Sequence, residues 1–360
     1  MGNSSTKYTQ VHNNLFVKAR LLEKQIKTCT KLDPVTQSSI LYVKQSRSYT
    51  SLVLPGGGLI SLASIAVIEY LTLHGCMKNI KSIGASSFSA IVAVLYSIGV
   101  PINNIKKYIF EINWKKILRK TTHKPCDSDI YHTAHGYGES NGKLLHDTIL
   151  SLILKHTGNK HYTLGDLKKD KGMTLILTAV DICSKSIVYF NTEQHSHVPL
   201  RVILRAVCGI PEIVSPIILD GYYLVDASIL QQCSSYLFDT KPKSLKSSKN
   251  TDLNINPNNL SVRIIRDLPM IDHTLMSDIT NQNKVIKPIK IKDYHTYSKY
   301  LLDITTSVQD DIILSPEAEL RIITTHLPMY SITNTNINND EFCSAMKAIT
   351  EDMEIYFHGI

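Results

Sequence analysis

The stretch from Leu52 to Ile68 constrains the fold most, because it is apolar and uncharged yet carries a proline and three consecutive glycines. A membrane-spanning helix needs about twenty uninterrupted apolar residues, and Pro55 followed by Gly56, Gly57 and Gly58 would break it. A short buried strand, a glycine turn and a buried helix account for the stretch better. The globular part of the chain should therefore open with a strand–turn–helix unit.

The same alternation of strand and helix patterns continues along the chain. Strands are predicted at 51–54, 80–83, 174–180, 186–190, 217–219, 222–225, 261–265 and 321–325. Helices are predicted at 59–73, 87–99, 102–118, 142–157, 200–208 and 340–357, the last capped by Asn339 or Asp340. Strands that alternate with helices indicate a three-layer α/β/α sandwich with a mainly parallel central sheet.

The pattern divides the chain into an N-terminal extension, 1–47, and one α/β domain, 48–360. The extension begins as a polar tail, and 15–32 has the spacing of a basic amphipathic helix. Such a helix either packs on the domain or faces a membrane. Residues 240–259 are rich in Lys, Ser and Asn and are predicted to be a polar surface insertion.

Charge and cysteine content exclude several classes of function. The net charge of +8 is spread along the chain without a recognisable nucleic-acid motif, so no nucleic-acid partner is expected. The seven cysteines are odd in number and form no C-x-x-C pair, which favours reduced thiols in the cytosol. His132 and His135 have ligand-like spacing, but no second pair follows, so we expect a polar loop and no metal site.

Two turns carry candidate chemistry. Three glycines before a helix, Gly56 to Gly58, let the backbone approach a phosphate or a developing oxyanion, although a plain tight turn has the same composition. The run Gly84 to Ala90 places serines between a strand and a helix. This is the arrangement of a nucleophile elbow, and also that of a serine-rich helix cap.

Together these turns resemble the patatin-like phospholipase family. In that family an apolar strand leads into G-G-G-x-R-G, the elbow reads G-T-S-x-G-A before a helix ending L-Y-A-x-G, and a later motif reads D-G-x-x-Y-x-D-G-G. The matching segments are 52–61, 85–99, 178–181 with 188–190, 204–211 and 220–228. The resemblance covers 50–235 and is fainter after residue 260.

The resemblance implies a lipid acyl hydrolase of the phospholipase A or lysophospholipase type, acting on phospholipids or other acyl esters without metal or cofactor. Its ungapped register makes Ser87 the nucleophile and Asp226 the general base, with the N–H groups of the loop from Gly56 through Gly57 to Gly58 as the oxyanion hole. Shifting the register to Ser86 would put a phenylalanine where the elbow needs a small residue. A Ser-His-Asp triad using His326 is the other hydrolase scheme.

The sequence departs from the family pattern at several positions. The arginine of the glycine motif is replaced by Ile60 and its last glycine by Ser61. Ala85 and Ser89 replace elbow glycines, and Ala227 replaces a glycine after the aspartate. Two outcomes follow: an active hydrolase with a strained site, or a decayed relative that serves as a lipid-binding or interaction module at membranes.

The first six residues match the M-G-x-x-x-[ST] pattern for N-myristoylation at Gly2. One myristoyl chain anchors a protein only marginally, and the basic segment 15–32 would supply a second signal. The expected location is cytoplasmic, with the protein bound peripherally to membranes.

Overall fold

A computed structural model describes residues 28–32, 39–43, 48–121, 127–134, 136–239, 255–267, 293–307, 320–328 and 331–358. Gly2 and the predicted basic helix up to residue 27 lie outside the described residues, as do 240–254 of the predicted insertion.

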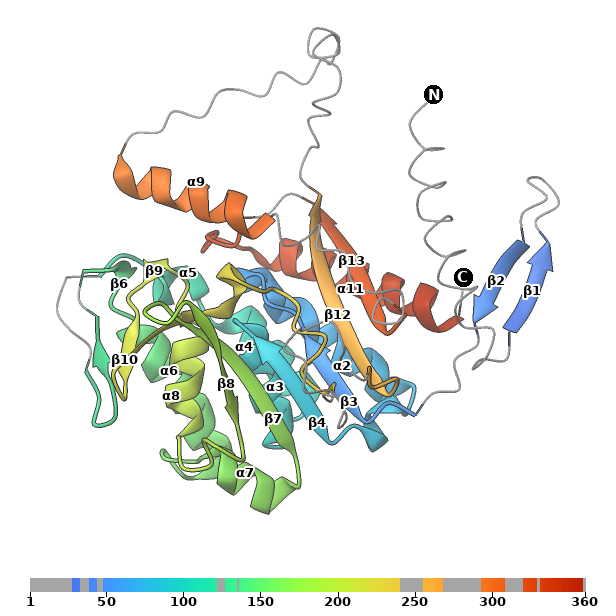
Figure 1. Ribbon diagram of the computed structural model, residues 1–360, viewed down its shortest axis with the longest axis horizontal. Coiled ribbons are helices and arrows are strands. Elements are labelled where there is room, and N and C mark those ends of the chain that lie inside the picture. The colour runs from blue at the N-terminus through green and yellow to red at the C-terminus, as the bar shows by residue number, and fades with distance from the viewer. Residues whose placement is uncertain are drawn as a thin grey trace, which may run out of the picture.

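The strands are β1 (Thr28–Leu32), β2 (Ser39–Val43), β3 (Ser51–Leu54), β4 (Ser82–Ser86), β5 (His132–Thr133), β6 (Gly138–Ser140), β7 (Thr174–Asp181), β8 (Ser186–Asn191), β9 (Glu212–Val214), β10 (Ile217–Leu219), β11 (Tyr222–Asp226), β12 (Asn259–Asp267) and β13 (Ile322–Pro328). Nine of them form one sheet in the order β13–β12–β3–β4–β7–β11–β10–β5, with β8 paired to β7 (Figure 1). The strands from β13 to β7 are parallel, and the other four are antiparallel to their neighbours.

The helices are α2 (Ile65–Leu73), α3 (Ser89–Ser97), α4 (Ile102–Glu111), α5 (Trp114–Ile117), α6 (Lys143–Thr157), α7 (Leu164–Lys171), α8 (Leu200–Val207), α9 (Tyr294–Ser307) and α11 (Asn339–His358), with 3-10 turns η1 (Gly58–Ser64), η2 (Cys76–Asn79) and η3 (Ala227–Ile229). Figure 1 shows α2, α3 and α4 behind the parallel strands. Both α2 and α3 are largely buried, and their sequences carry a single charge, Glu69 in α2. The predicted α/β fold with a central sheet flanked by helices is confirmed.

The parallel strands carry the candidate site at their carboxyl ends. Leu52, Val53 and Leu54 of β3 are fully buried, and the chain passes directly from this strand into the glycine loop and η1. Ser87 follows β4 in the same way. Since neighbouring parallel strands end at one edge of the sheet, the two turns lie side by side.

Several elements differ from the predictions. The end of the predicted basic helix is the strand β1, which pairs antiparallel with β2. The predicted helix 102–118 breaks at Asn113, whose side chain accepts a hydrogen bond from the Lys116 N–H and so starts α5 as a separate turn. The cap of α11 is Asn338, because its side chain accepts from the Glu341 N–H while the Glu341 carboxylate accepts from the Asn338 N–H.

A buried ion pair lies where the predicted polar insertion leaves and re-enters the domain. Both side chains, Arg321 and Asp239, are shielded from solvent and joined by two hydrogen bonds. Asn256 donates its N–H to the same carboxylate at 2.9 Å. The predicted end of the insertion at residue 259 is wrong, however, since Asn259 begins β12. In the part of the chain that the structure describes, no helix has both the length and the apolar character needed to cross a bilayer.

Candidate functional site

Ser87 occupies a strained turn between β4 and α3. Its φ of 58° lies in the left-handed region, which a residue with a Cβ adopts only at a cost. The turn is held by its carbonyl, which accepts the Ala90 N–H at 3.0 Å and the Cys208 thiol at 3.4 Å. The result is a serine side chain presented at the sheet edge beside the start of a helix, as in a nucleophile elbow.

Strand register brings Asp226 to this serine. One edge of β7 pairs with β8, so β4 and β11 share the other edge. Ser86 pairs with Thr178 at the end of β4, and Asp226 pairs with the next residue, Ala179, at the end of β11. The residue after Ser86 is therefore the one that meets the aspartate.

The two side chains form one short hydrogen bond. Ser87 Oγ donates to Asp226 Oδ2 at 2.5 Å, and both side chains are buried, with relative exposures of 0% and 1%. The other carboxylate oxygen accepts the Ser228 N–H at 2.8 Å. Burial raises the pKa of Asp226 to about 6, although the hydrogen bonds from Ser87 and Ser228 oppose the shift. A carboxylate with this pKa can take a proton from a neighbouring hydroxyl near neutral pH.

The adjacent serine has a different role in the structure. Ser86 Oγ is hydrogen-bonded to Thr178 Oγ1 at 2.6 Å, between β4 and β7. Its side chain thus ties two strands together and is directed away from the aspartate. His326, the base of the alternative triad, lies on the edge strand β13, and β12 and β3 separate that strand from β4.

The glycine loop closes over the same edge. Gly57 and Gly58 have φ angles of 130° and 70°, and a Cβ on Gly58 would come within 2.4 Å of the Ile332 carbonyl oxygen. The Gly56 N–H donates to the Gln232 carbonyl at 2.7 Å, so this donor is already engaged. Gly57 and Gly58 remain as the candidate oxyanion donors of the three predicted glycines.

The two serines that replace family glycines, Ser61 and Ser89, both form hydrogen bonds within the site. The Ser61 hydroxyl donates to the Gly58 carbonyl at 2.7 Å and accepts the Ser89 N–H at 3.1 Å, which links the glycine loop to the first turn of α3. The Ser89 hydroxyl donates to the Ser86 carbonyl at 2.8 Å. Ala85 and Ala227 are fully buried in apolar packing, and Ile60 is 5% exposed. The elbow thus forms without the glycines that the family pattern has.

Three residues near the dyad were not predicted from the sequence as parts of the site. Ser228 lies against Gly56, whose Cβ would meet the serine hydroxyl at 2.4 Å. Gln232 binds Gly56 through its backbone, and Ile332 covers Gly58 from a loop before α11. Ser228 carried a signal, since it stands two positions after Asp226, where the family's D-G-G motif has its last glycine. Gln232 and Ile332 make their contacts through backbone atoms, and such contacts leave no signal in the sequence.

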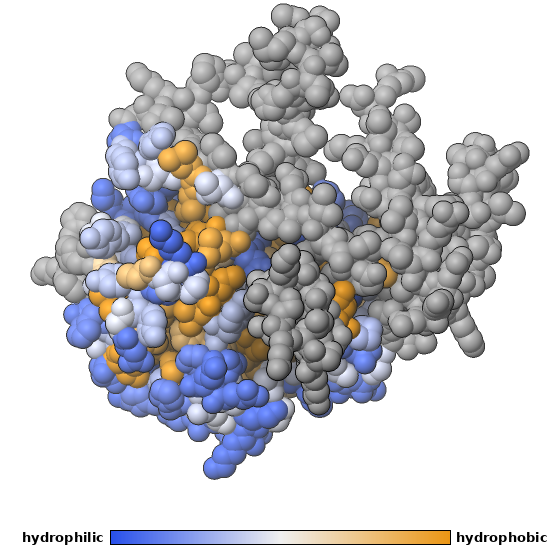
Figure 2. All heavy atoms as spheres, in the orientation of Figure 1, coloured by the Kyte–Doolittle hydropathy of each residue, from blue (hydrophilic) through white to orange (hydrophobic). Residues whose placement is uncertain are grey.

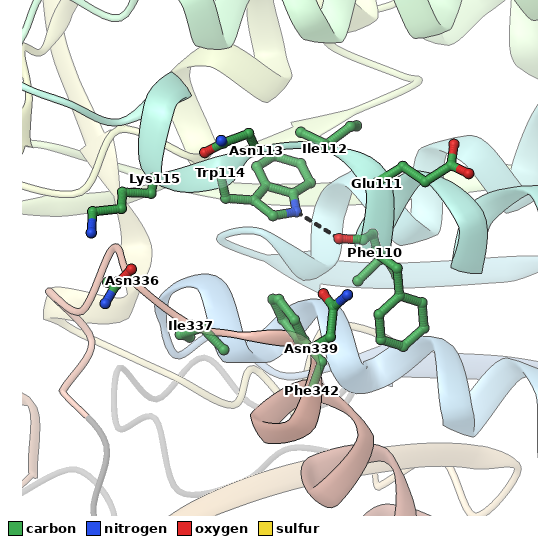
Figure 3. A pocket seen from close by; sticks show the side chains of 11 residues that line it. Phe110, Glu111, Ile112, Asn113, Trp114, Lys115, Asn336, Ile337, Asn339 and Phe342 are labelled. Atoms are coloured by element: carbon green, nitrogen blue, oxygen red, sulfur yellow. Dashed lines mark hydrogen bonds between the residues drawn. The ribbon is translucent and has the colours of Figure 1, made fainter.

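The hollow drawn in Figure 3 lies beside the site and contains neither Ser87 nor Asp226. It is formed by the end of α4, by α5 and by the start of α11. Trp114 lines it and donates its indole N–H to the Ile109 carbonyl at 3.0 Å. The Trp114 ring also packs edge-on against Phe88, next to Ser87.

Comparison with known proteins identifies the family. The family model described as patatin-like phospholipase matches residues 52–233, a little over half of the chain. The chain belongs to the patatin-like phospholipase family, a family of lipid hydrolases.

Individual relatives are distant. An uncharacterized protein, R571 of Acanthamoeba polyphaga mimivirus, is 24% identical over 190 residues, which are 52% of this chain and 61% of the relative. The chain thus spans less than two thirds of that relative. The crystal structure of VipD from Legionella pneumophila has a TM-score of 0.54 at 14% identity, over 95% of this chain and 72% of VipD. ExoU of Pseudomonas aeruginosa, solved with SpcU, aligns with a TM-score of 0.40 at 13% identity, over 93% of this chain and 59% of ExoU.

Proposed function

We propose that the chain hydrolyses acyl esters of membrane lipids with Ser87 as nucleophile and Asp226 as general base. The observation that carries the proposal is the 2.5 Å hydrogen bond from Ser87 Oγ to a buried carboxylate at a left-handed elbow. The family supports a lipid as the substrate class. A phospholipid or a lysophospholipid is the substrate type that we propose.

The reaction follows from the two side chains. Asp226 Oδ2 accepts the hydroxyl proton as Ser87 Oγ bonds to the ester carbonyl carbon. The N–H groups of Gly57 and Gly58 stabilise the negative oxygen, a contribution of a few kcal/mol per donor. The tetrahedral intermediate expels the alkoxide, which takes the proton from Asp226, and an acyl-serine remains. Water then attacks, gives its proton to the same carboxylate, and releases the fatty acid as Ser87 is protonated again.

A membrane is the surface on which we propose that the chain meets its substrate. Exposed apolar side chains surround the carboxyl edge of the sheet. Tyr294, Tyr297 and Leu301 lie at helical spacing on α9, which packs on η3 directly after Asp226. Ile182 and Tyr222 lie at the neighbouring strand ends. Figure 2 shows an apolar area between α9 and the strands, bordered by hydrophilic residues. Aromatic side chains with one polar atom suit a membrane interface.

The experiment for the hydrolase measures fatty-acid release from phospholipid vesicles, from lysophospholipid and from a short-chain ester. Wild type is compared with Ser87→Ala, Asp226→Asn and the neighbouring control Ser86→Ala. We expect release by wild type and by Ser86→Ala, and none above background by the other two. Equal rates for all four proteins would mean that the chain is a decayed relative, and its role would then be lipid binding.

Myristoylation at Gly2 and the basic segment 15–32 stay part of the proposal as membrane anchors in the cytoplasm. Intact-mass measurement of protein from eukaryotic cells, with Gly2→Ala beside wild type, tests the modification. Membrane flotation of the same two proteins tests its consequence. An unmodified Gly2, or equal flotation of both, would remove this anchor.

A further inference from the structure

Three side chains with metal-binding atoms meet where two helices end. His74 follows α2, while Glu354 and His358 lie one turn apart at the end of α11. One ligand atom from each lies within 4.8 Å of the other two. Four atoms that bind one small cation have separations of this size or less.

His74 is already oriented for binding. Its Nδ1 lies 2.8 Å from the Tyr70 carbonyl oxygen. A carbonyl oxygen only accepts, so Nδ1 carries the hydrogen and Nε2 presents its lone pair. The Tyr70 ring stacks on the imidazole with 4.0 Å between ring centroids. Hydrogen-bonded and packed imidazoles of this kind are typical of protein metal ligands.

The other two ligands project from one helix, α11. Glu354 and His358 are four residues apart, so both project from one face of α11, with His358 Nε2 at 3.5 Å from Glu354 Oε2. The Tyr70 side chain is 3% exposed, and its hydroxyl has no hydrogen-bond partner among the described residues. Burial, and after it the charge of Glu354, raises the pKa of the Tyr70 hydroxyl.

We propose that His74, Glu354 and His358 bind one zinc ion through two imidazole nitrogens and one carboxylate oxygen. Zinc takes this donor set with tetrahedral geometry, and water can fill the fourth position. Imidazole donors favour zinc over magnesium and calcium, which prefer all-oxygen sites. The ion would join the end of α11 to the end of α2. Because α11 also packs on η1, which begins at Gly58, the ion would stabilise the helix that borders the glycine loop.

Zinc titration of the full chain, freed of metal by a chelator, tests the proposal by calorimetry. Wild type is compared with His74→Ala, Glu354→Gln and His358→Ala, and with His132→Ala as an exposed histidine control outside the cluster. We expect one equivalent of zinc per chain and at least about 100-fold weaker binding in the three variants, because a direct ligand contributes no less than its supporting hydrogen bonds. The control should bind as wild type does, and magnesium should not compete.

A second measurement separates a metal site from a simple Glu354–His358 ion pair. Zinc should raise the unfolding midpoint of wild type and His132→Ala by several degrees and leave that of the three variants unchanged. Cobalt in place of zinc should give the intense visible absorption of tetrahedral coordination. Wild type without a saturable site, or His74→Ala with wild-type affinity, would overturn the proposal. Neither result depends on whether the chain hydrolyses lipids.

Discussion

Asp181 and Asp226 stand on the same pair of strands, and both are almost fully buried, yet their environments are opposite. The Asp181 carboxylate accepts the backbone N–H groups of Cys183, Ser184 and Tyr223 at 2.9–3.3 Å. Burial alone would raise the pKa of Asp181, but the hydrogen bonds from Ser184 and from these N–H groups lower it. Asp226 has one backbone donor and one hydroxyl, and burial raises its pKa to about 6. Backbone donors thus make a buried carboxylate a structural anchor, and their scarcity makes it a base.

Activity should separate the two aspartates by the largest margin. Asp226→Asn removes the proton acceptor, so kcat should fall by about 10²–10⁴-fold. The Asp181 carboxylate is bonded to the backbone of Cys183, Ser184 and Tyr223 and not to Ser87, so the kcat of Asp181→Asn should stay within about tenfold of wild type. Ester hydrolysis by the two purified variants measures this difference. Comparable losses in both would mean that Asp226 acts only through the fold.

Asp226→Asn should lose activity but gain folding stability at neutral pH. A carboxyl group whose folded pKa is raised contributes stability below its unfolded pKa of about 3.9, and that contribution is lost as the pH rises through about 6. The loss is about 3 kcal/mol for a shift of roughly two units. Asp226→Asn should therefore match wild type near pH 4 and exceed its free energy of unfolding at pH 7. Denaturant unfolding at both pH values measures this, and a variant that is less stable at pH 7 contradicts it.

For Asp181 the pH dependence has the opposite sign. Its folded pKa is lowered, so its contribution is present above about pH 4 and is lost as the pH falls through the folded pKa. Asp181→Asn keeps the shape but weakens three charge-assisted hydrogen bonds, and we expect a loss of about 1–3 kcal/mol at pH 7. The deficit should shrink in acid unfolding curves. A deficit that is constant with pH would show that packing, and not charge, holds this turn.

The sequence predicts the buried elements of the fold better than the exposed ones. Apolar runs predicted β3 and β7, because burial on both faces leaves a continuous apolar pattern. The strand predicted at 80–83 lies at Ser82–Ser86, as β4, whose Ser, Gly and Ala residues form no such run. The helix α7 was missed, although the capping box of Thr163 and Asp166 was a usable signal. The amphipathic helix α9 was missed because its Tyr-, Thr- and Ser-rich sequence has weak helical propensity.

In the candidate site, the motif resemblance predicted Ser87 and Asp226. What brings these two residues together, rather than neighbouring Ser and Asp residues, is the strand register, which the sequence does not reveal. Only the pairing of Asp226 with Ala179, beyond the end of β4, explains why this aspartate reaches the serine. The Ile332 carbonyl that covers Gly58 could not be predicted, since a backbone contact between segments far apart leaves no pattern in side chains.

The smallest effect is expected at the elbow itself. Ser89→Gly restores the family residue but removes the hydroxyl that donates to the Ser86 carbonyl. The elbow already forms with serine at this position, and the substitution removes one hydrogen bond. The free energy of unfolding should therefore fall by no more than about 1 kcal/mol, and kcat should change by no more than about twofold. Thermal unfolding and ester hydrolysis measure both quantities. A large gain in rate would show that Ser89 strains the turn.

The most direct test of the central claim is the pH dependence of Ser87 modification by a fluorophosphonate probe, which reacts with activated serines. The labelled peptide is identified by mass spectrometry, and the labelling rate is followed from pH 4 to 8. We expect a single adduct on Ser87. The labelling rate should rise through about pH 6 in wild type and in Asp181→Asn, and labelling should be lost in Asp226→Asn. An adduct on Ser86, or an unchanged rate in Asp226→Asn, would contradict it.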